Sequence, residues 1–328
     1  MLGGQNNYSR EQYEQLSHLH IKYLLAALAF GLLLCKGSRA DTDTTSTNFT
    51  ELTTKTSNEL RALVEDEPLR RFKRQAIQRL AISAGSLTDD SLSSKHRWFE
   101  TEIGTAIPLG SFENILATSV LFRNDALEVP ALGFERNDLY ELSVSFFLKK
   151  PLSRQSNLLI NFMPSYLGDL QATDHAFGMF GMALVTNELE FHDLTLSYGV
   201  VHLNQLDIGI LPAVGLRWEP NPEININLRF PESTISWRLA KDLQLSEHWL
   251  HASLGFGGNR WGIRDAVRTD SKVQLKYWSA TITLEQIVAG GGGWWIHLSY
   301  QFARRFVNNA SSEFELGNGF QIAAELAY

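Results

Sequence analysis

Residues 223–230 read EININLRF, in which polar and apolar side chains alternate without interruption. Successive side chains of a β-strand point to opposite faces, so the apolar residues from Ile224 to Phe230 would all lie on one face. This alternation predicts a strand whose two faces meet chemically different surroundings. The same pattern recurs in four further segments, residues 139–149, 157–166, 294–302 and 320–328. We therefore predict an all-β fold.

The length of the alternating segments separates two architectures that share this pattern. A soluble sandwich buries its apolar faces, whereas a membrane barrel turns apolar side chains to lipid and polar ones to the lumen. Many segments run about 10–13 residues, nearer to the length of a tilted membrane-crossing strand than to that of a soluble strand. We predict an antiparallel transmembrane β-barrel of 12–14 strands, with a soluble sandwich as the alternative.

The predicted strands fall between residues 76 and 328. They are expected at 76–84, 97–107, 112–122, 138–149, 157–167, 177–187, 194–204, 210–219, 223–230, 233–240, 247–258, 272–285, 294–306 and 318–328. The pairs 76–84/97–107 and 223–230/233–240 carry the weakest pattern, which leaves twelve strands open. Short connections at 108–111, 150–156, 188–193 and 220–222 mostly alternate with long ones at 123–137, 259–271 and 307–317. Bacterial outer-membrane barrels show this asymmetry between periplasmic turns and extracellular loops.

Residues 1–40 have the organisation of a secretory signal peptide. A cationic segment, residues 1–22, precedes the apolar run YLLAALAFGLLL at 23–34, and Ser38 and Ala40 place small residues before a cleavage site. A retained anchor helix and an acylated cysteine are the alternatives. Export of a barrel implies a bacterial outer-membrane location.

Residues 41–75 are expected to form a flexible linker with at most one short helix, because the stretch 41–58 is rich in Thr, Ser and Asp. Four basic residues near its end are expected to form a solvated face, with contact to anionic lipid as the alternative. They are Arg70, Arg71, Lys73 and Arg74.

Aromatic residues lie near the predicted strand ends, where a barrel keeps its interfacial girdles. They are Trp98, Phe99, Tyr140, Tyr166, Trp218, Trp237, Trp261, Trp294 and Tyr328. The last strand alternates from Phe320 to the final aromatic Tyr328. It resembles the C-terminal signal read by the barrel-assembly machinery, which we expect as a partner together with outer-membrane lipids.

Residues 211–220 read LPAVGLRWEP and are followed by LRFP at 228–231 and ISWRL at 235–239. Together with RRF at 304–306, these motifs resemble the signature of a family of uncharacterised bacterial outer-membrane β-barrels, over residues 76–328. The resemblance implies a barrel fold and an outer-membrane location, and it implies no particular activity.

The composition excludes several function classes. The chain of 328 residues carries 36 acidic and 29 basic residues, and this acidic balance argues against a nucleic-acid partner. Its one cysteine, Cys35, excludes a disulfide framework and a cysteine-based zinc site. The mean hydropathy of −0.14 is that of a folded chain.

Sequence motifs of known chemistry are missing from the chain. It has no GxSxG elbow, no Walker loop and no HExxH. The glycines at 255–258 and 290–293 are expected in tight turns. His251 and His297 each share a polar face with a serine two residues on, but no orienting acid is evident in the sequence. We therefore predict no catalytic residues, no metal site and no cofactor.

Charged residues with the phase of the polar face form the candidate site. A charge on the lipid face costs about 2–4 kcal/mol at mid-bilayer, so these side chains are expected to face the lumen. They are Glu100, Glu102, Glu141, Lys149, Arg217, Glu219, Glu223, Arg229, Arg238, Lys276, Arg305 and Glu325.

Three functions are consistent with such an interior. The first is a channel or passive transporter for small polar solutes, which we favour. The second is a structural or binding barrel whose lumen is blocked by ion pairs and hydrogen bonds. The third, a lipid-modifying outer-membrane enzyme, requires turnover that depends on His251 or His297.

Overall fold

A computed structural model describes residues 68–328 except 70, 72, 74, 90–93, 130–136, 190–192, 204–208, 243–244, 265–269 and 309–311. The predicted signal peptide, residues 1–40, and most of the predicted linker lie outside the described residues.

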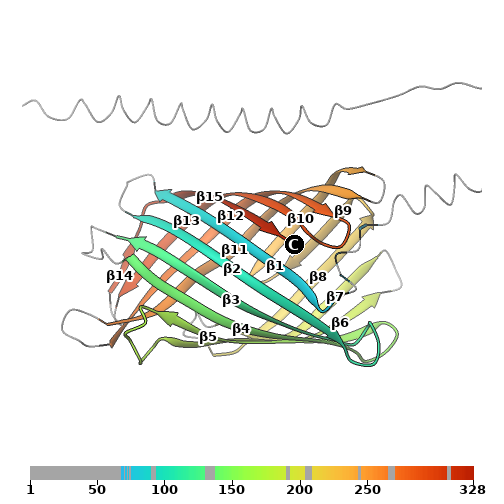
Figure 1. Cartoon of the computed structure of the whole chain (residues 1–328), viewed down its shortest axis with the longest axis horizontal. Helices are drawn as coiled ribbons and strands as arrows, with labels where there is room; N and C mark the ends of the chain where they lie inside the picture. The colour runs from blue at the N-terminus through green and yellow to red at the C-terminus, as the bar shows by residue number, and fades with distance from the viewer. Residues whose placement is uncertain are drawn as a thin grey trace, which may run out of the picture. The chain divides into compact units, whose positions relative to one another are not determined.

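The described chain folds into fifteen strands (Figure 1). The first eight are β1 (Ile77–Asp89), β2 (Lys95–Pro108), β3 (Ile115–Glu128), β4 (Asn137–Pro151), β5 (Ser156–Gly168), β6 (Phe177–Leu189), β7 (Leu194–His202) and β8 (Leu211–Asn221). The others are β9 (Ile224–Arg229), β10 (Glu232–Asp242), β11 (Ser246–Arg264), β12 (Asp270–Val288), β13 (Gly293–Asn308), β14 (Ser312–Glu315) and β15 (Gly319–Ala327).

All of these strands except β14 form one closed antiparallel barrel. Each strand from β1 to β13 pairs with the next, and β15 closes the ring between β13 and β1. The β1–β15 register runs from Ala81↔Ala327 to Asp89↔Gly319. The short β14 pairs with β13 outside this ring. The prediction of an all-β antiparallel barrel is confirmed, with 14 strands, and the sandwich alternative is wrong.

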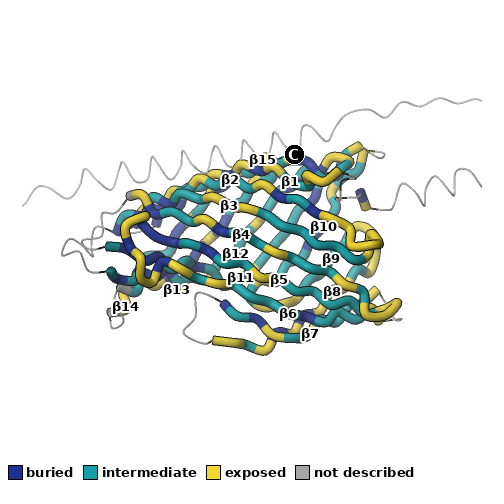
Figure 2. Tube along the Cα trace, turned by 60° about the horizontal axis from the view of Figure 1, so that its bottom comes forward, coloured by how far each residue is buried: buried dark blue, intermediate teal, exposed yellow. Residues whose placement is uncertain are grey.

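Apolar side chains point outward from the barrel and polar side chains point inward. On β4, Leu142 and Phe146 are exposed on the outside, whereas Ser143 between them is buried. Exposed large apolar residues occur on every strand of the ring, for example Ile82, Ile103, Val120, Phe162, Met179, Val200, Val214, Leu228, Leu239, Leu254, Ile282, Ile296 and Ile322. Figure 2 shows this alternation of exposure along the strands. A soluble protein would bury these residues instead.

The two ends of the barrel differ in their connections. At the end where β1 begins and β15 ends, which we call the terminal mouth, connections such as 222–223 and 289–292 are short. At the opposite end, the far mouth, connections such as 129–136 and 203–210 are longer. The prediction of a long loop at 259–271 is wrong. Most of these residues belong to the paired strands β11 and β12, which extend beyond their predicted ends.

The expectation for the glycines at 255–258 is also wrong. These residues lie inside β11 rather than in a turn, and they are paired with residues 276–279 of β12. The glycines at 290–293 do occupy the β12–β13 connection, where Gly290 and Gly291 adopt positive φ angles. The first run therefore adds length to a strand, whereas the second makes a tight turn.

The far mouth is partly filled by an apolar core. It consists of Leu127, Val129, Leu139, Leu167, Trp261, Ile263, Val273, Leu275 and Phe306, packed with Tyr277 and Leu316. Buried residues accordingly gather at this end in Figure 2. The end of β5 also touches β11 across the barrel, since Gly168 pairs with Gly262. The far mouth is thus closed on the side of β11–β13 and β3–β5.

Two of the nine predicted girdle aromatics point inward instead. Trp261 is fully buried in the far-mouth core. Trp98 lies on the inner face, where the Arg123 guanidinium sits 4.6 Å from its ring centroid. Alternation alone could not separate these two from aromatics on the outer face, because both are close to strand ends.

Candidate functional site

The segment that precedes β1 lies against the barrel at the terminal mouth. Its Arg71 guanidinium makes a bidentate ion pair with Glu285 on the inner face of β12, at 3.1 and 3.2 Å. The backbone N–H of Leu69 donates to Glu247 on β11 at 3.0 Å, and the ammonium of Lys73 lies 4.0 Å from the Tyr328 ring centroid. The prediction that the basic cluster forms a solvated face is therefore wrong for Lys73, which is buried, whereas the Arg71 side chain stays 59% exposed while it pairs with Glu285.

The close packing of this segment is visible in the turn that follows β12. Gly291 has a φ of +85°, and a Cβ there would come within 2.1 Å of the Arg71 carbonyl oxygen. Desolvation lowers the pKa of Lys73, and the neighbouring Arg79 lowers it further. We call residues 68–73, of which 68, 69, 71 and 73 are described, the entry segment.

The two carboxylates that hold the entry segment are almost fully buried. Side chains of Glu247 and Glu285 are each 2% exposed. Glu247 also faces Arg238 at 3.4 Å and Lys241 at 3.8 Å, and it accepts a hydrogen bond from the Trp249 indole at 2.9 Å. Removing the cation partner of a buried carboxylate is strongly destabilising. These acids therefore require basic partners, and the entry segment supplies one of them.

Glu285 also joins a hydrogen-bonded chain across three strands. The His251 Nε2 atom lies 2.8 Å from a Glu285 oxygen, and its Nδ1 atom lies 2.8 Å from the Ser236 hydroxyl. The sequence analysis found no acid for His251, because Glu285 is 34 residues away and reaches it only through β11–β12 pairing. The serine that bonds His251 is Ser236 on the neighbouring strand β10, rather than Ser253 on the same strand. His297, by contrast, meets the Thr283 hydroxyl at 2.9 Å.

A second network lines the inner faces of β1–β4 and β15. Arg79 bridges Glu102 at 2.7 Å and also contacts Glu325. Arg123 pairs with Asp125 at 2.9 Å and lies 3.6 Å from Glu100. Basic and acidic side chains alternate along this wall. The predicted interior of mixed charge is therefore found here, and its charges form ion pairs.

Asp125 extends the second network toward the far mouth. His96 contacts the Asp125 carboxylate at 2.7 Å, and both side chains are buried. Beyond them, Arg304 lies 3.6 Å from Asp89 and donates to the Ser94 hydroxyl at 2.9 Å. These interactions occupy the inner wall directly beneath the far-mouth core.

Of the twelve predicted lumen residues, most lie on the inner face, and three do not. Glu223 lies exposed in the turn between β8 and β9. Lys276 shares the outward phase of Trp278, and Arg305 pairs at 3.2 Å with Glu313 next to β14. A bulge at Ala303, with a φ of +49°, shifts the phase of β13 by one residue. Arg304 therefore points inward in place of Arg305.

The remaining predicted residues differ in how they are paired. Glu100, Glu102 and Glu325 belong to the ion pairs of the second network, and Arg238 contacts Glu247. Glu141 accepts a hydrogen bond from Ser143 at 2.7 Å. Arg217 pairs with Glu219 at 2.5 Å on β8. Lys149 and Arg229 have the inward phase of β4 and β9.

Six residues that hold the two mouths together were not predicted from the sequence as lumen residues. They are Arg71, Glu247, Glu285, Arg123, Asp125 and Arg304. The signal available for the strand residues was their inward phase, which Glu247 shares with His251 and Glu285 shares with Thr283. The role of Arg71 had no such signal, since it precedes the first strand.

A connection at the far mouth is fixed by the carboxylate of Asp270. Residues 169–176 are held by Asp270, which accepts from the N–H groups of Thr173 and Asp174 at 2.8 and 2.9 Å, and from Arg264 at 2.9 Å. The Arg264 hydrogen bond, followed by those two N–H groups, holds the Asp270 pKa well below its usual range. The connection is thereby fastened onto the β11–β12 hairpin.

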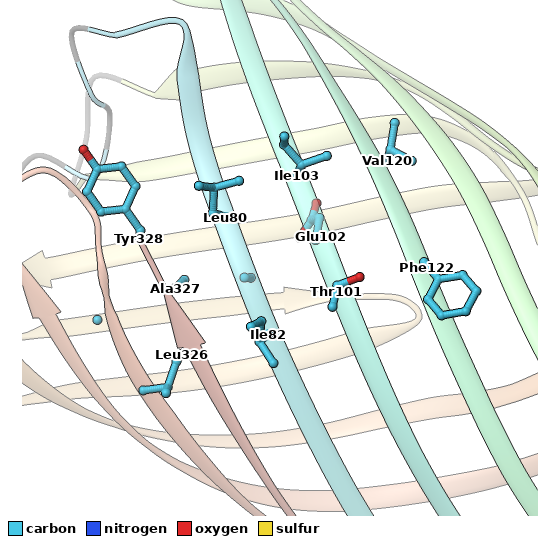
Figure 3. Close-up of a pocket in the computed structure, with 12 residues that line it drawn as sticks. Leu80, Ile82, Thr101, Glu102, Ile103, Val120, Phe122, Leu326, Ala327 and Tyr328 are labelled. Atoms are coloured by element: carbon cyan, nitrogen blue, oxygen red, sulfur yellow. The ribbon is translucent and has the colours of Figure 1, made fainter.

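The outer surface has an apolar hollow of about 680 Å³ over the seam where β15 meets β1. Leu80, Ile82 and Ile103 lie side by side there, whereas Glu102 projects to the other side of the sheet (Figure 3). The hollow is continuous with the apolar outer face.

The described residues do not bring metal-ligating side chains together. They contain no group of three or more His, Cys, Asp or Glu side chains placed to hold a metal ion. In the same part of the chain there is no helix long and apolar enough to cross a membrane.

Comparisons with known proteins do not identify a family. No family model matches the chain. No curated protein matches it either. Among solved structures, a protein from Nitrosomonas europaea whose description names AttH aligns with 11% identity over 87% of this chain and 98% of its own. The TM-score of 0.12 carries no argument about fold or function.

Proposed function

We propose that this protein is a bacterial outer-membrane β-barrel that passes small solutes through a lumen closed at rest. The outward apolar face supports membrane insertion, because a closed barrel pairs the backbone groups of its strands with one another and this orientation presents mainly apolar side chains to lipid. The motifs at 211–220 and 228–231 favour the uncharacterised outer-membrane family that they resemble.

The proposal of a closed lumen rests on the contacts that the entry segment makes with the barrel wall at the terminal mouth. Arg71 reaches the inner wall to pair with Glu285, and Leu69 is anchored on Glu247. At the other end, the far-mouth core fills one side of the lumen. The inner faces of β6–β9 retain exposed residues such as Arg217 and Arg229, so the remaining route runs along these strands. Release of the entry segment would then open the lumen.

Planar bilayer recording on the refolded protein tests this function. We expect the wild type to be nearly silent, and Arg71→Ala combined with Lys73→Ala to produce stepwise conductance. Arg154→Ala, in the exposed turn after β4, is the matched control and should remain silent. Silence of both variants would favour the structural barrel with a blocked lumen, and open wild-type pores would contradict the gate.

A further inference from the structure

Outside the far-mouth core, one stretch of the inner wall gathers apolar side chains from four neighbouring strands. It consists of Leu159, Phe180, Met182, Leu184, Val201, Leu203, Leu211 and Ala213, from β5 to β8, and we call it the apolar lumen patch. Many inward positions elsewhere in the barrel carry hydroxyl, amide or charged groups, such as Ser299, Thr281 and Gln301. A water-filled polar pore would not need such a patch.

The patch is less completely packed than the far-mouth core. All nine central residues of that core are buried. In the patch, by contrast, Leu159, Phe180, Met182 and Leu211 are only half-buried, although they share the inner face with the buried members. Gly199, level with Leu184, adds no side chain to this stretch of the wall, and a Cβ there would lie 2.0 Å from the Ala183 carbonyl oxygen. Apolar surface therefore remains free inside the lumen, and it is stabilised by covering it with an apolar ligand.

The pairing of the strands orders the patch along the barrel axis. Met182 is level with Val201, which is level with Leu211, and Leu184 is level with Leu159. Leu203 and Leu211 flank the 204–210 connection at the far mouth. From Leu203 to Gly199 the patch spans about 13 Å at roughly 3.3 Å per residue. This is an elongated apolar strip that begins at the rim.

The wall turns polar and basic directly below the strip. Gly215 follows Ala213 on the inner face of β8, and a Cβ on Gly215 would lie 3.0 Å from the Arg229 Cβ. Arg217, the next inward residue of β8, is about half exposed and pairs with Glu219. Among the described residues no ion pair is made by Arg229. The first residue of the adjoining strand β10 is an acid, Glu232. Its Cβ and Cγ atoms pack against Gly255 of β11, on the side away from β9.

From this arrangement we infer that the lumen binds an aliphatic chain with an anionic head, such as a medium-chain carboxylate. The chain lies on the apolar lumen patch, and the head meets Arg229 and Arg217. The inference rests on the proposed function for its biological role, since it names the class of solute, but the binding site itself does not require transport.

Equilibrium dialysis with isotope-labelled dodecanoate tests the site on wild-type protein in lipid nanodiscs, with protein-free nanodiscs as the blank. We expect saturable binding of one dodecanoate per barrel. Met182→Gln keeps the side-chain length but places an amide beside the chain, and it should raise Kd by about tenfold or more. Leu121→Gln, on the inner face of β3, is the matched control and should leave Kd unchanged.

The head group is tested with Arg229→Gln. This variant should lower affinity for dodecanoate while leaving that for dodecanol, the uncharged analogue, unchanged. Circular dichroism verifies the barrel fold of every variant. Absence of saturable wild-type binding, or equal losses in Met182→Gln and Leu121→Gln, would overturn the inference. Binding without any conductance in the Arg71→Ala, Lys73→Ala protein would overturn the transport function and leave the site standing.

Discussion

Arg304 and Arg305 are neighbours in the chain, yet they occupy opposite sides of the barrel wall. Arg304 is fully buried beside Asp89, Ser94 and the Gly317 carbonyl oxygen, which accepts a hydrogen bond at 2.8 Å. Arg305 is half exposed next to Glu313. The inversion comes from the bulge at Ala303, and a single residue with positive φ cannot be read from alternating polarity.

This pair yields a matched prediction. Arg304→Gln should destabilise the barrel by about 3–5 kcal/mol, because it leaves a buried carboxylate without its cation. Arg305→Gln should cost about 1 kcal/mol or less, as expected for an exposed ion pair. Equilibrium urea unfolding in lipid vesicles measures both. Equal losses of unfolding free energy in the two variants would contradict the inward position of Arg304 that the bulge produces.

Gly262 carries a second residue-scale prediction. A Cβ at this position would lie 2.6 Å from the Ala176 backbone nitrogen, so Gly262→Val should push residues 169–176 away from β11. The expected cost is about 1–3 kcal/mol in the free energy of unfolding. The control is Gly209→Val, where a Cβ would meet nothing within 4 Å. Similar stabilities for the two variants would show that the close approach is absent.

At the scale of the elements, period-two alternation was sufficient to predict the strands of the ring, because each strand separates two different surroundings. It placed 223–230 and 233–240 as separate strands, which β9 and β10 confirm. It failed where both faces of a strand are covered. The extension of β11 beyond residue 258 carries Trp261 and Ile263 into the far-mouth core, so its pattern resembles a loop with scattered apolar residues.

The candidate site was predictable only in part. Inward phase identified Glu100, Glu102 and Glu325, whose partner Arg79 lies on the neighbouring strand. Partners that meet through strand pairing, such as His251 and Glu285, need the register, which alternation does not supply. The entry segment was missed because its position depends on tertiary contacts rather than on a strand pattern.

The connection 169–176 gives a prediction at this scale. Asp270→Asn should speed amide hydrogen exchange at Thr173 and Asp174, whose N–H groups it binds. Because the Asp270 pKa is lowered by Arg264, the carboxylate interaction is present above the ordinary Asp pKa and is lost as the pH falls below the lowered value. Asp174→Asn removes the same charge without removing this acceptor. Identical amide exchange rates in the two variants would argue against a role of the Asp270 carboxylate in holding the connection 169–176.

For the whole molecule, the proposed orientation predicts which face tolerates charge. Val120 and Ser119 are adjacent on β3, and only Val120 points outward. Val120→Arg should therefore cost about 2–4 kcal/mol if that face meets the bilayer centre, whereas Ser119→Arg should cost far less. Equilibrium unfolding in lipid vesicles measures the free energy of unfolding of both variants. A reversed order would mean that the outward face does not contact lipid.

The direction of insertion is open to the same kind of test. The chain has no cysteine after Cys35, so single cysteines in the barrel are unambiguous reporters. Gln171→Cys at the far mouth should react with a membrane-impermeant maleimide in intact cells. Ser111→Cys at the terminal mouth should react only after the outer membrane is permeabilised. Labelling of Ser111→Cys alone in intact cells would place the short turns outside.

The position of β15 between β13 and β1 has a consequence for biogenesis. The partner of the first strand is synthesised last, so the edges of β1 and β13 stay unpaired until β15 is available. Unpaired strand edges can pair with strands of other chains. A chain in this state therefore aggregates unless a chaperone binds it. Cyclisation of the wall is thus a single late event, and loss of residues 319–327 would leave an open, adhesive sheet rather than a smaller ring.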